Sequence, residues 1–308
     1  MDTYKLRGCY ATIVTPFLQG NEIDEPELKK EIDFLCETNI TGLFPLASTS
    51  EFPFLSYESK RQYLRAVAQA NRGRKAMLAG CCGVNDTETM SLLELAAQYG
   101  YDAAVVCPPY YFSQSADALY RYYMAIAQNP YNVKIILYNI PAFTAEIPVE
   151  LVARLMRNPN IIGIKDSSGN MRRISNIADY RRIHNRPDFL IYLGNDDILL
   201  PGITAGSDGS LSAICCVLPE VVAHLYESYD RGDMEGAQTA QRSIVELTRL
   251  AESLPFPAGY KMIAKARGMN VGVEHTFCDP AAAETVNNRI KEIVERITEA
   301  YNCQGAVM

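Results

Sequence analysis

Short apolar runs and amphipathic segments alternate along most of the 308-residue chain. The segments between the runs carry apolar residues at spacings of three and four, which is typical of helices that bury one face. Ser56 is suited to cap a helix over residues 58–70, and Asn85 or Asp86 to cap one over residues 87–99. Eight runs have the length of a strand: residues 9–14, 42–46, 76–81, 103–107, 135–138, 161–164, 190–193 and 209–214.

Strands that are separated by helices at intervals of about 30 residues are expected to be parallel, and eight such units predict a closed (β/α)8 barrel. After Pro219 the pattern is only helical. One helix face contains Ala237, Ala240, Ile244, Leu247, Ala251 and Leu254. Further helices are predicted over residues 259–267 and 280–300. We therefore expect an α/β barrel domain, residues 1–225, followed by a small all-helical domain, residues 226–308.

Composition excludes several classes of protein. The formal net charge is -7, and no cluster of basic residues is interleaved with aromatic ones, so we expect no nucleic-acid partner. No apolar run approaches the roughly 20 residues of a membrane span, and the first residues do not resemble a secretory signal. The sequence therefore predicts a cytoplasmic protein without a membrane partner.

Cysteine and histidine spacing gives no sign of a metal site or a disulfide framework. The nine cysteines include two adjacent pairs but no CxxC spacing, which favours reduced, mostly buried thiols. The three histidines, His184, His224 and His275, are far apart in the sequence. We expect no metal.

The run IIGIKDSSGN ends on Lys165, and the predicted fold gives that position a meaning. Active sites of (β/α)8 barrels lie at the carboxyl ends of the strands. Lys165 is the only one of ten lysines that follows a predicted strand. Desolvation there lowers a lysine pKa from about 10.4 toward neutrality and leaves an amine that can attack a carbonyl. Simple exposure of Lys165 to water is the alternative.

Other predicted strands end in hydroxyl groups, which would lie on the same rim of the barrel. Such groups suit a proton relay and a carboxylate-binding site beside an amine. Helix capping by serine and threonine, and interface packing by paired tyrosines, are the alternatives. The hydroxyls are Tyr138 in LYNIP, Ser48, Thr49 and Ser50 in STSEF, and Tyr110 and Tyr111 in CPPYYF.

In combination, these motifs resemble the dihydrodipicolinate synthase and N-acetylneuraminate lyase superfamily of Schiff-base aldolases. The resemblance covers the whole barrel, from GCYATIVTPF through STSEFPFLS, CPPYYF, LYNIP and GIKDSSGN to GNDD and AGSDGSLS. It implies that Lys165 forms an imine with pyruvate or another 2-keto acid, without an organic cofactor. It further implies that Tyr138 relays protons and that Ser48 and Thr49 receive the keto acid's carboxylate, Thr49 also belonging to the relay.

The same resemblance implies that Tyr111 completes the relay from a neighbouring subunit. The active unit would then be at least a homodimer, and the family's usual arrangement is a homotetramer built from two dimers. Leu211, in AGSDGSLS, completes the substrate-binding residues that the resemblance implies.

Two departures from the family pattern bear on the substrate. Ala47 and Ser50 replace the glycines that usually flank the hydroxyl pair, so we expect a locally reshaped loop. Phe143 stands where lysine-pathway synthases have an arginine that grips a substrate carboxylate, and a phenyl ring cannot make that contact. Asp196 and Asp197 resemble the acidic pair with which sialic acid lyases bind sugar hydroxyls. Capping of the next helix is the alternative.

We therefore expect a class I pyruvate-dependent aldolase or lyase that acts on a sialic or sugar-derived 2-keto acid and an aldehyde. One alternative is 4-hydroxy-tetrahydrodipicolinate synthase, which condenses pyruvate with aspartate semialdehyde. Dehydratase or deaminase chemistry through the same enamine also stays open. An alternative of another class is a non-catalytic keto-acid sensor on the same scaffold, which would not need a proton relay.

Overall fold

The computed structural model describes residues 2–273 and 275–303. Within these residues, eight parallel strands close into a barrel in the order of the chain, and a helical segment follows, as the sequence predicts. The strands are β1 (Gly8–Thr12), β2 (Gly42–Phe44), β3 (Ala76–Gly80), β4 (Ala103–Val106), β5 (Ile135–Asn139), β6 (Ile161–Asp166), β7 (Leu190–Leu193) and β8 (Gly209–Ser212).

The helices lie where the amphipathic segments predict them. Ser56 caps α2 by accepting a hydrogen bond from the Ser59 amide at 3.1 Å, and Asn85, not Asp86, caps α3. The helices are α1 (Glu25–Cys36), α2 (Tyr57–Asn71), α3 (Asp86–Gln98), α4 (Ala116–Ile126), α5 (Val149–Leu155), α6 (Met171–Ile183), α7 (Leu199–Thr204), α8 (Ile214–Val217), α9 (Pro219–Asp230), α10 (Met234–Ala251), α11 (Ala258–Ala266) and α12 (Pro280–Ala300). Short 3-10 helices are η1 (Thr3–Leu6), η2 (Gln19–Asn21), η3 (Ser48–Ser50), η4 (Phe52–Phe54) and η5 (Asp196–Ile198).

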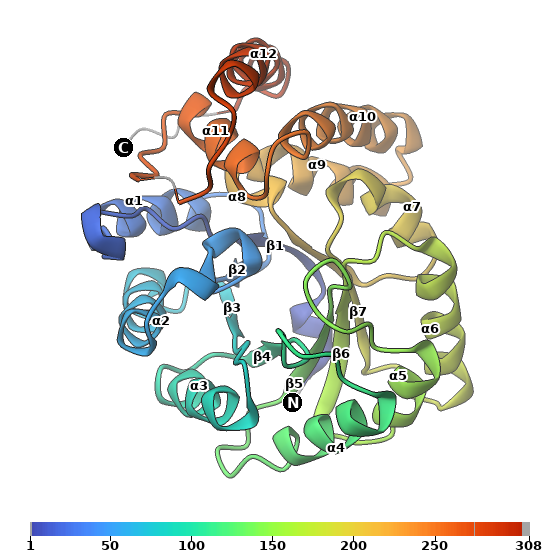
Figure 1. The fold of residues 1–308 in the computed structure, drawn as a ribbon. Coiled ribbons are helices and arrows are strands. Elements are labelled where there is room, and N and C mark those ends of the chain that lie inside the picture. Colours follow the sequence, from blue (N-terminus) through green and yellow to red (C-terminus); the bar gives the residue numbers. More distant parts are fainter. Residues whose placement is uncertain (1, 274, 304–308) are drawn as a thin grey trace. The chain divides into compact units, whose positions relative to one another are not determined.

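The chain divides into two compact units. The first comprises Ala76–Leu211 together with the segment up to Gly8, and in it helices α3 to α6 lie outside the strands (Figure 1). The second comprises Cys9–Lys75 and the chain from Ser212 onward. In the second unit α9 packs on α10, and α12 packs on α10 and α11. The domain ranges 1–225 and 226–308 stay a prediction, and residues 1 and 304–308 lie outside the described part.

Strand β6 continues two residues beyond the apolar run that predicts it, and this extension positions the site. Its backbone pairs Tyr138 of β5 with Lys165, and Asn139 with Asp166. Lys165 also pairs with Tyr192 of β7. The hydrophobic pattern ends at Ile164 because Lys165 and Asp166 are polar. The backbone pairing of the strand nevertheless continues through both residues.

The buried residues are mainly apolar and include several cysteines. None of the nine cysteines forms a disulfide, and six of them are buried. Among residues 2–273 and 275–303, no group of three or more histidine, cysteine or acidic side chains is placed to hold a metal ion. No helix in that part of the chain is both long and apolar enough to cross a bilayer.

Candidate active site

Lys165 is buried beside Tyr138 near the carboxyl end of β6. Lys165 is only 4% exposed, so the alternative of an exposed lysine is wrong. The Lys165 Nζ lies 4.3 Å from the centroid of the Tyr138 ring. Burial lowers the pKa of Lys165 to about 7, because the charged form loses its hydration, while the charges of Asp196 and Cys82 oppose the shift. A substantial fraction of Lys165 is therefore a neutral, nucleophilic amine at neutral pH.

Asp196 and Asp197 follow β7 in the 3-10 helix η5. The N-cap of η5 is Asn195, and neither η5 nor α7 has a side-chain cap, so the capping role considered for these aspartates is wrong. Asp196 is buried, and its charge raises the pKa of Lys165 against the larger effect of burial. Asp197 is half-buried. Asp196 therefore acts electrostatically on the amine, which the sequence did not indicate.

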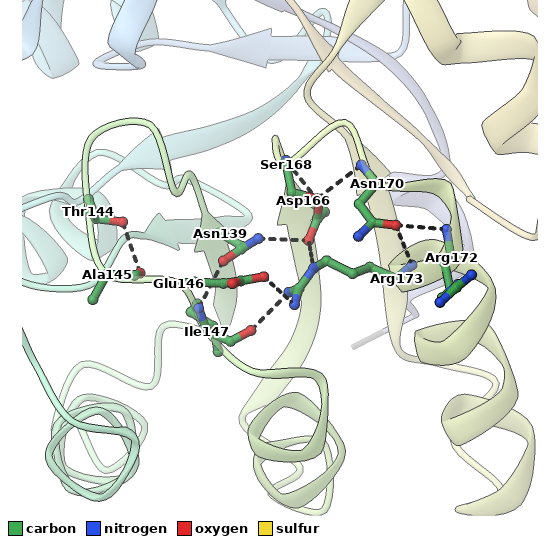
Figure 2. Close-up of polar contacts among 10 residues, drawn as sticks. All are labelled: Asn139, Thr144, Ala145, Glu146, Ile147, Asp166, Ser168, Asn170, Arg172 and Arg173. Atoms are coloured by element: carbon green, nitrogen blue, oxygen red, sulfur yellow. Dashed lines mark hydrogen bonds and ion pairs between the residues drawn. The ribbon is translucent and has the colours of Figure 1, made fainter.

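The ends of β5 and β6 are held by a buried polar network that includes the residues directly after Tyr138 and Lys165 (Figure 2). Asn139 Nδ2 donates to Asp166 Oδ2 at 2.9 Å. Arg173 Nε donates to the same oxygen at 3.1 Å. The backbone amide of Ser168 donates to the other carboxylate oxygen of Asp166 at 3.0 Å. Because the two strand ends are cross-linked through these side chains, the backbone that carries the lysine and the tyrosine is fixed.

Ser48 and Thr49 belong to the second compact unit and lie in η3, directly after β2. Thr49 is buried, and its hydroxyl lies 3.2 Å from the hydroxyl of Thr12 in β1. Thr12 also donates to the carbonyl of Ser212 at 3.1 Å. Thr12 therefore orients one of the two predicted hydroxyls. Sequence reasoning missed it, because a threonine inside a buried strand gives no signal of its own.

Ser50 braces the η3 loop with its hydroxyl. Ser50 Oγ donates to the Ile13 carbonyl at 2.6 Å and accepts from the Ala47 amide at 3.2 Å. The left-handed backbone positions that flank this loop are Leu46 (φ 54°) and Glu51 (φ 55°), and Ser50 is not among them. Serine is therefore accommodated at the family's glycine position without the strain that a positive φ would impose.

The remaining predicted residues differ in exposure. Tyr111 is 89% exposed, with φ 83°, and its ring packs edge-on against Phe112 at 5.0 Å between centroids. Phe143 is 55% exposed, in the turn after β5, where its amide donates to the Ile140 carbonyl at 3.0 Å. Leu211 is buried in β8. Tyr111 therefore does not share the buried setting of Lys165 and Tyr138.

A closed barrel of parallel strands with a buried amine of lowered pKa at a strand end suits a barrel enzyme that works through a lysine Schiff base. The sequence model of the dihydrodipicolinate synthetase family matches residues 5–300, and the chain belongs to this family. Members of the family are lyases and aldolases, which use a catalytic lysine Schiff base with pyruvate and no external cofactor. The protein is therefore a lyase of this kind.

Individual relatives agree with that assignment. A 4-hydroxy-tetrahydrodipicolinate synthase of Listeria innocua is 32% identical over 274 residues, which cover 88% of this chain and 91% of the relative. The structure of YagE, an E. coli K12 prophage protein of the dihydrodipicolinic acid synthase family in complex with pyruvate, matches with TM-score 0.87 and 27% identity, over 93% of this chain and 98% of YagE. A Ruminococcus gnavus sialic acid aldolase with a mutated catalytic lysine shares the fold, with TM-score 0.87, 21% identity and coverage of 96% and 98%.

Proposed function

We propose that this protein is a pyruvate-dependent class I aldolase that works through an imine on Lys165 and acts on a sugar-derived 2-keto acid. The observation that supports this most strongly is the burial of Lys165, which lowers its pKa to about 7. In the synthetic direction the neutral amine attacks the ketone carbon of pyruvate, and water leaves as the imine forms. Loss of a proton from the adjacent carbon gives an enamine, which attacks the aldehyde carbon. Hydrolysis of the product imine frees the lysine, and cleavage runs through the same steps in reverse.

Other residues receive roles in this proposal from the family resemblance. Tyr138, next to the amine, relays protons between the imine and the enamine. Ser48 and Thr49 receive the carboxylate of the keto acid, and Thr49 also belongs to the relay. Tyr111 completes the relay of a neighbouring copy, and the exposure of its ring and of Phe112 supports that assignment. Asp196 and Asp197 bind substrate hydroxyls, and Leu211 contacts the substrate.

The residues of the turn after β5 favour a second substrate without a carboxylate. The exposed side chains there include Phe143 and Glu146, and the sequence has no arginine between Tyr138 and Leu151. Arg173 does not replace the missing arginine, because its three nitrogens donate to Asp166, Glu146 and the carbonyl of Ile147. A phenyl ring beside a carboxylate suits the carbon skeleton and hydroxyls of a sugar better than the anionic group of aspartate semialdehyde.

The names of the curated relatives favour the second candidate, 4-hydroxy-tetrahydrodipicolinate synthase. A coupled assay of pyruvate release across sialic acid and other sugar acids, with condensation of pyruvate and aspartate semialdehyde run in parallel, separates the two candidates. We expect release from at least one sugar acid and slow condensation. Efficient condensation with aspartate semialdehyde contradicts our choice of substrate, and pyruvate binding without any turnover contradicts an enzyme and favours the sensor.

Phe143→Arg sharpens the same assay. A guanidinium at this position adds a charge-assisted contact to a carboxylate, so we expect condensation with aspartate semialdehyde to gain about tenfold while cleavage of the sugar acid falls. Phe143→Leu is the matched control, since it removes the ring without adding charge. Equal effects of both variants on the two reactions contradict the role of Phe143 in substrate choice.

We propose a homodimer, or a tetramer of two dimers, in which the exposed Tyr111 and Phe112 are covered by a neighbouring copy. Nine cysteines outside any disulfide fit a reducing compartment, so we place the protein in the cytoplasm. Sedimentation of the wild type and of Tyr111→Ala tests the assembly. A monomeric wild type with full activity contradicts it.

A further inference from the structure

We propose that Arg173 is a positioning residue that couples the strand end carrying Lys165 to the substrate loop, residues 140–147 between β5 and α5. The inference rests on the proposed function, because it assigns the loop that contains Phe143 a part in binding the second substrate. Arg173 does not itself contact substrate in this proposal. It holds the loop in register with the amine.

The guanidinium of Arg173 uses each of its three nitrogens on a different group (Figure 2). Nε donates to Asp166 Oδ2 at 3.1 Å, next to Lys165 in β6. Nη1 donates to Glu146 Oε1 at 2.9 Å, and Nη2 donates to the Ile147 carbonyl at 2.8 Å. The last two acceptors belong to the carboxyl end of the substrate loop. A single planar group therefore joins the lysine's strand to that loop.

A second link runs in parallel through Asn139, the residue after Tyr138. Its Nδ2 donates to Asp166 Oδ2 at 2.9 Å, and its Oδ1 accepts from the Ile147 amide at 2.9 Å. Ile147 is thus held at both its amide and its carbonyl. Asp166 is the group that both links share. Asp166 directly follows Lys165, and its paired residue in β5, Asn139, directly follows Tyr138.

Helix α6, which carries Arg173, is capped at its amino terminus, close to Arg173 itself. Asn170 caps α6, accepting from the amides of Arg172 at 3.1 Å and Arg173 at 3.4 Å. Arg173 and Asp166 are both buried, whereas Glu146 is exposed. The ion pair between Arg173 and Asp166 is therefore little screened by solvent. The ion pair between Arg173 and Glu146 is more exposed, and a movement of the loop would break it first.

Lysine cannot take the place of this arginine, because an ammonium is a point charge without a planar fork and cannot reach three acceptors that lie in different directions. Arg173→Lys keeps the charge opposite Asp166 and loses the connection to the loop. Arg172→Lys makes the same chemical change one residue earlier, on an exposed side chain, and is the matched control. Glu146→Ala removes only the exposed partner and serves if Arg173→Lys does not fold.

Hydrogen exchange of the full-length protein tests the coupling without any assumption about the reaction. We expect the amides of residues 140 and 142–147 to exchange at least about tenfold faster in Arg173→Lys, which loses both charge-assisted hydrogen bonds to the loop. Glu146→Ala loses only one of them, and we expect a smaller increase. Exchange in α10 and in Arg172→Lys should match the wild type. Unchanged exchange of residues 140–147 in both Arg173→Lys and Glu146→Ala overturns the proposal.

Steady-state kinetics then test the consequence for the reaction. We expect Arg173→Lys to raise the KM for the cleaved keto acid about tenfold, with a smaller loss in the rate at which borohydride traps pyruvate on Lys165. A lower melting temperature with unchanged KM and kcat would show that the network is only structural, which overturns the positioning role. A wild type that pyruvate does not label contradicts the proposed function instead, and the exchange comparison still decides the coupling.

Discussion

Three lysines of this protein are buried, and two of them, Lys165 and Lys261, differ in what surrounds the ammonium group. Lys261, in α11 of the second unit, is 1% exposed and forms an ion pair with the buried carboxylate of Glu51. Its Nζ also donates to the Val273 carbonyl at 3.3 Å and lies 4.8 Å from the centroid of the Phe17 ring. At Lys165 burial outweighs the attraction of Asp196, and the pKa falls to about 7. Burial alone therefore does not single out the reactive lysine, because Lys261 is as buried as Lys165 and is paired with a carboxylate.

The contrast gives Lys261 a definite place in the structure. Glu51, its partner, directly follows Ser50 at the end of η3 and adopts a left-handed backbone conformation. The ion pair therefore fixes the end of the segment that carries Ser48 and Thr49. Lys261 therefore supports the segment with Ser48 and Thr49, whereas Lys165 provides the amine that we propose to react with the keto acid.

The largest difference between the two lysines should appear in turnover. Lys165→Ala removes the amine and the covalent path with it, so we expect kcat to fall by at least about 10³-fold. The measurement is pyruvate release from the best sugar acid under saturating conditions, with circular dichroism as the control for folding. Activity that survives in Lys165→Ala contradicts the claim that Lys165, unlike Lys261, is the reactive lysine.

The second difference is in stability. Lys261→Met leaves the Glu51 carboxylate buried without its partner, and we expect the free energy of unfolding to fall by about 3–5 kcal/mol in urea titrations. Lys261→Met combined with Glu51→Leu removes both charges and should regain much of that loss. A double variant no more stable than the single one contradicts the ion pair as the cause.

The third difference is in how stability depends on pH. Unfolded lysine binds its proton up to pH about 10.4, whereas folded Lys165 releases it near pH 7. Between these values the unfolded state binds more protons, so the destabilising effect of Lys165 is full below pH 7 and fades as pH rises. We expect Lys165→Met to be more stable than the wild type at pH 6.5, by the order of a few kcal/mol, and the gain to shrink by pH 9.5.

Lys134→Met is the control for the pH experiment. Lys134 is half-buried and donates to Asn160 Oδ1 at 2.6 Å, so its substitution also removes a lysine that has a polar contact. Chemical denaturation at the two pH values gives the free energies for all three proteins. A gain for Lys165→Met that stays constant with pH contradicts a neutral amine in the folded state.

The smallest effect concerns the charge that opposes burial at Lys165. Asp196→Asn removes an attraction that raises the pKa of the lysine, so we expect the midpoint of borohydride trapping against pH to move to lower pH. Asp197→Asn, next in the chain and half-buried, is the matched control. A midpoint that moves upward contradicts the electrostatic role of Asp196.

Much of this picture could be predicted from the sequence, because the barrel follows from the order and spacing of apolar runs. Once the strands are in order, Lys165 and Tyr138 must be neighbours on adjacent strands, and the register pairs them. Those inferences need only local pattern and topology. The catalytic and binding roles of Ser48, Thr49, Tyr111, Phe143 and Leu211 stay predictions that the experiments above test.

The supporting contacts could not be predicted, for a physical reason. Glu51 and Lys261 lie 210 positions apart in the sequence, and helical periodicity does not tell which distant carboxylate a buried lysine will meet. Arg173 appears in the sequence as one of two arginines at the start of a helix, and only the packing shows that it is buried while Arg172 is exposed. The contact of Thr12 with Thr49 could not be predicted either, because the partner of a side chain in a strand depends on how the neighbouring segments pack.

The most direct test of the account is to incubate the wild-type protein with pyruvate and borohydride and to map the labelled peptide by mass spectrometry. We predict one added mass per chain, on Lys165, with Lys261 unmodified in the same sample as the internal comparison. No adduct on Lys165, or labelling of Lys261 in its place, would contradict the claim that Lys165 is the reactive amine.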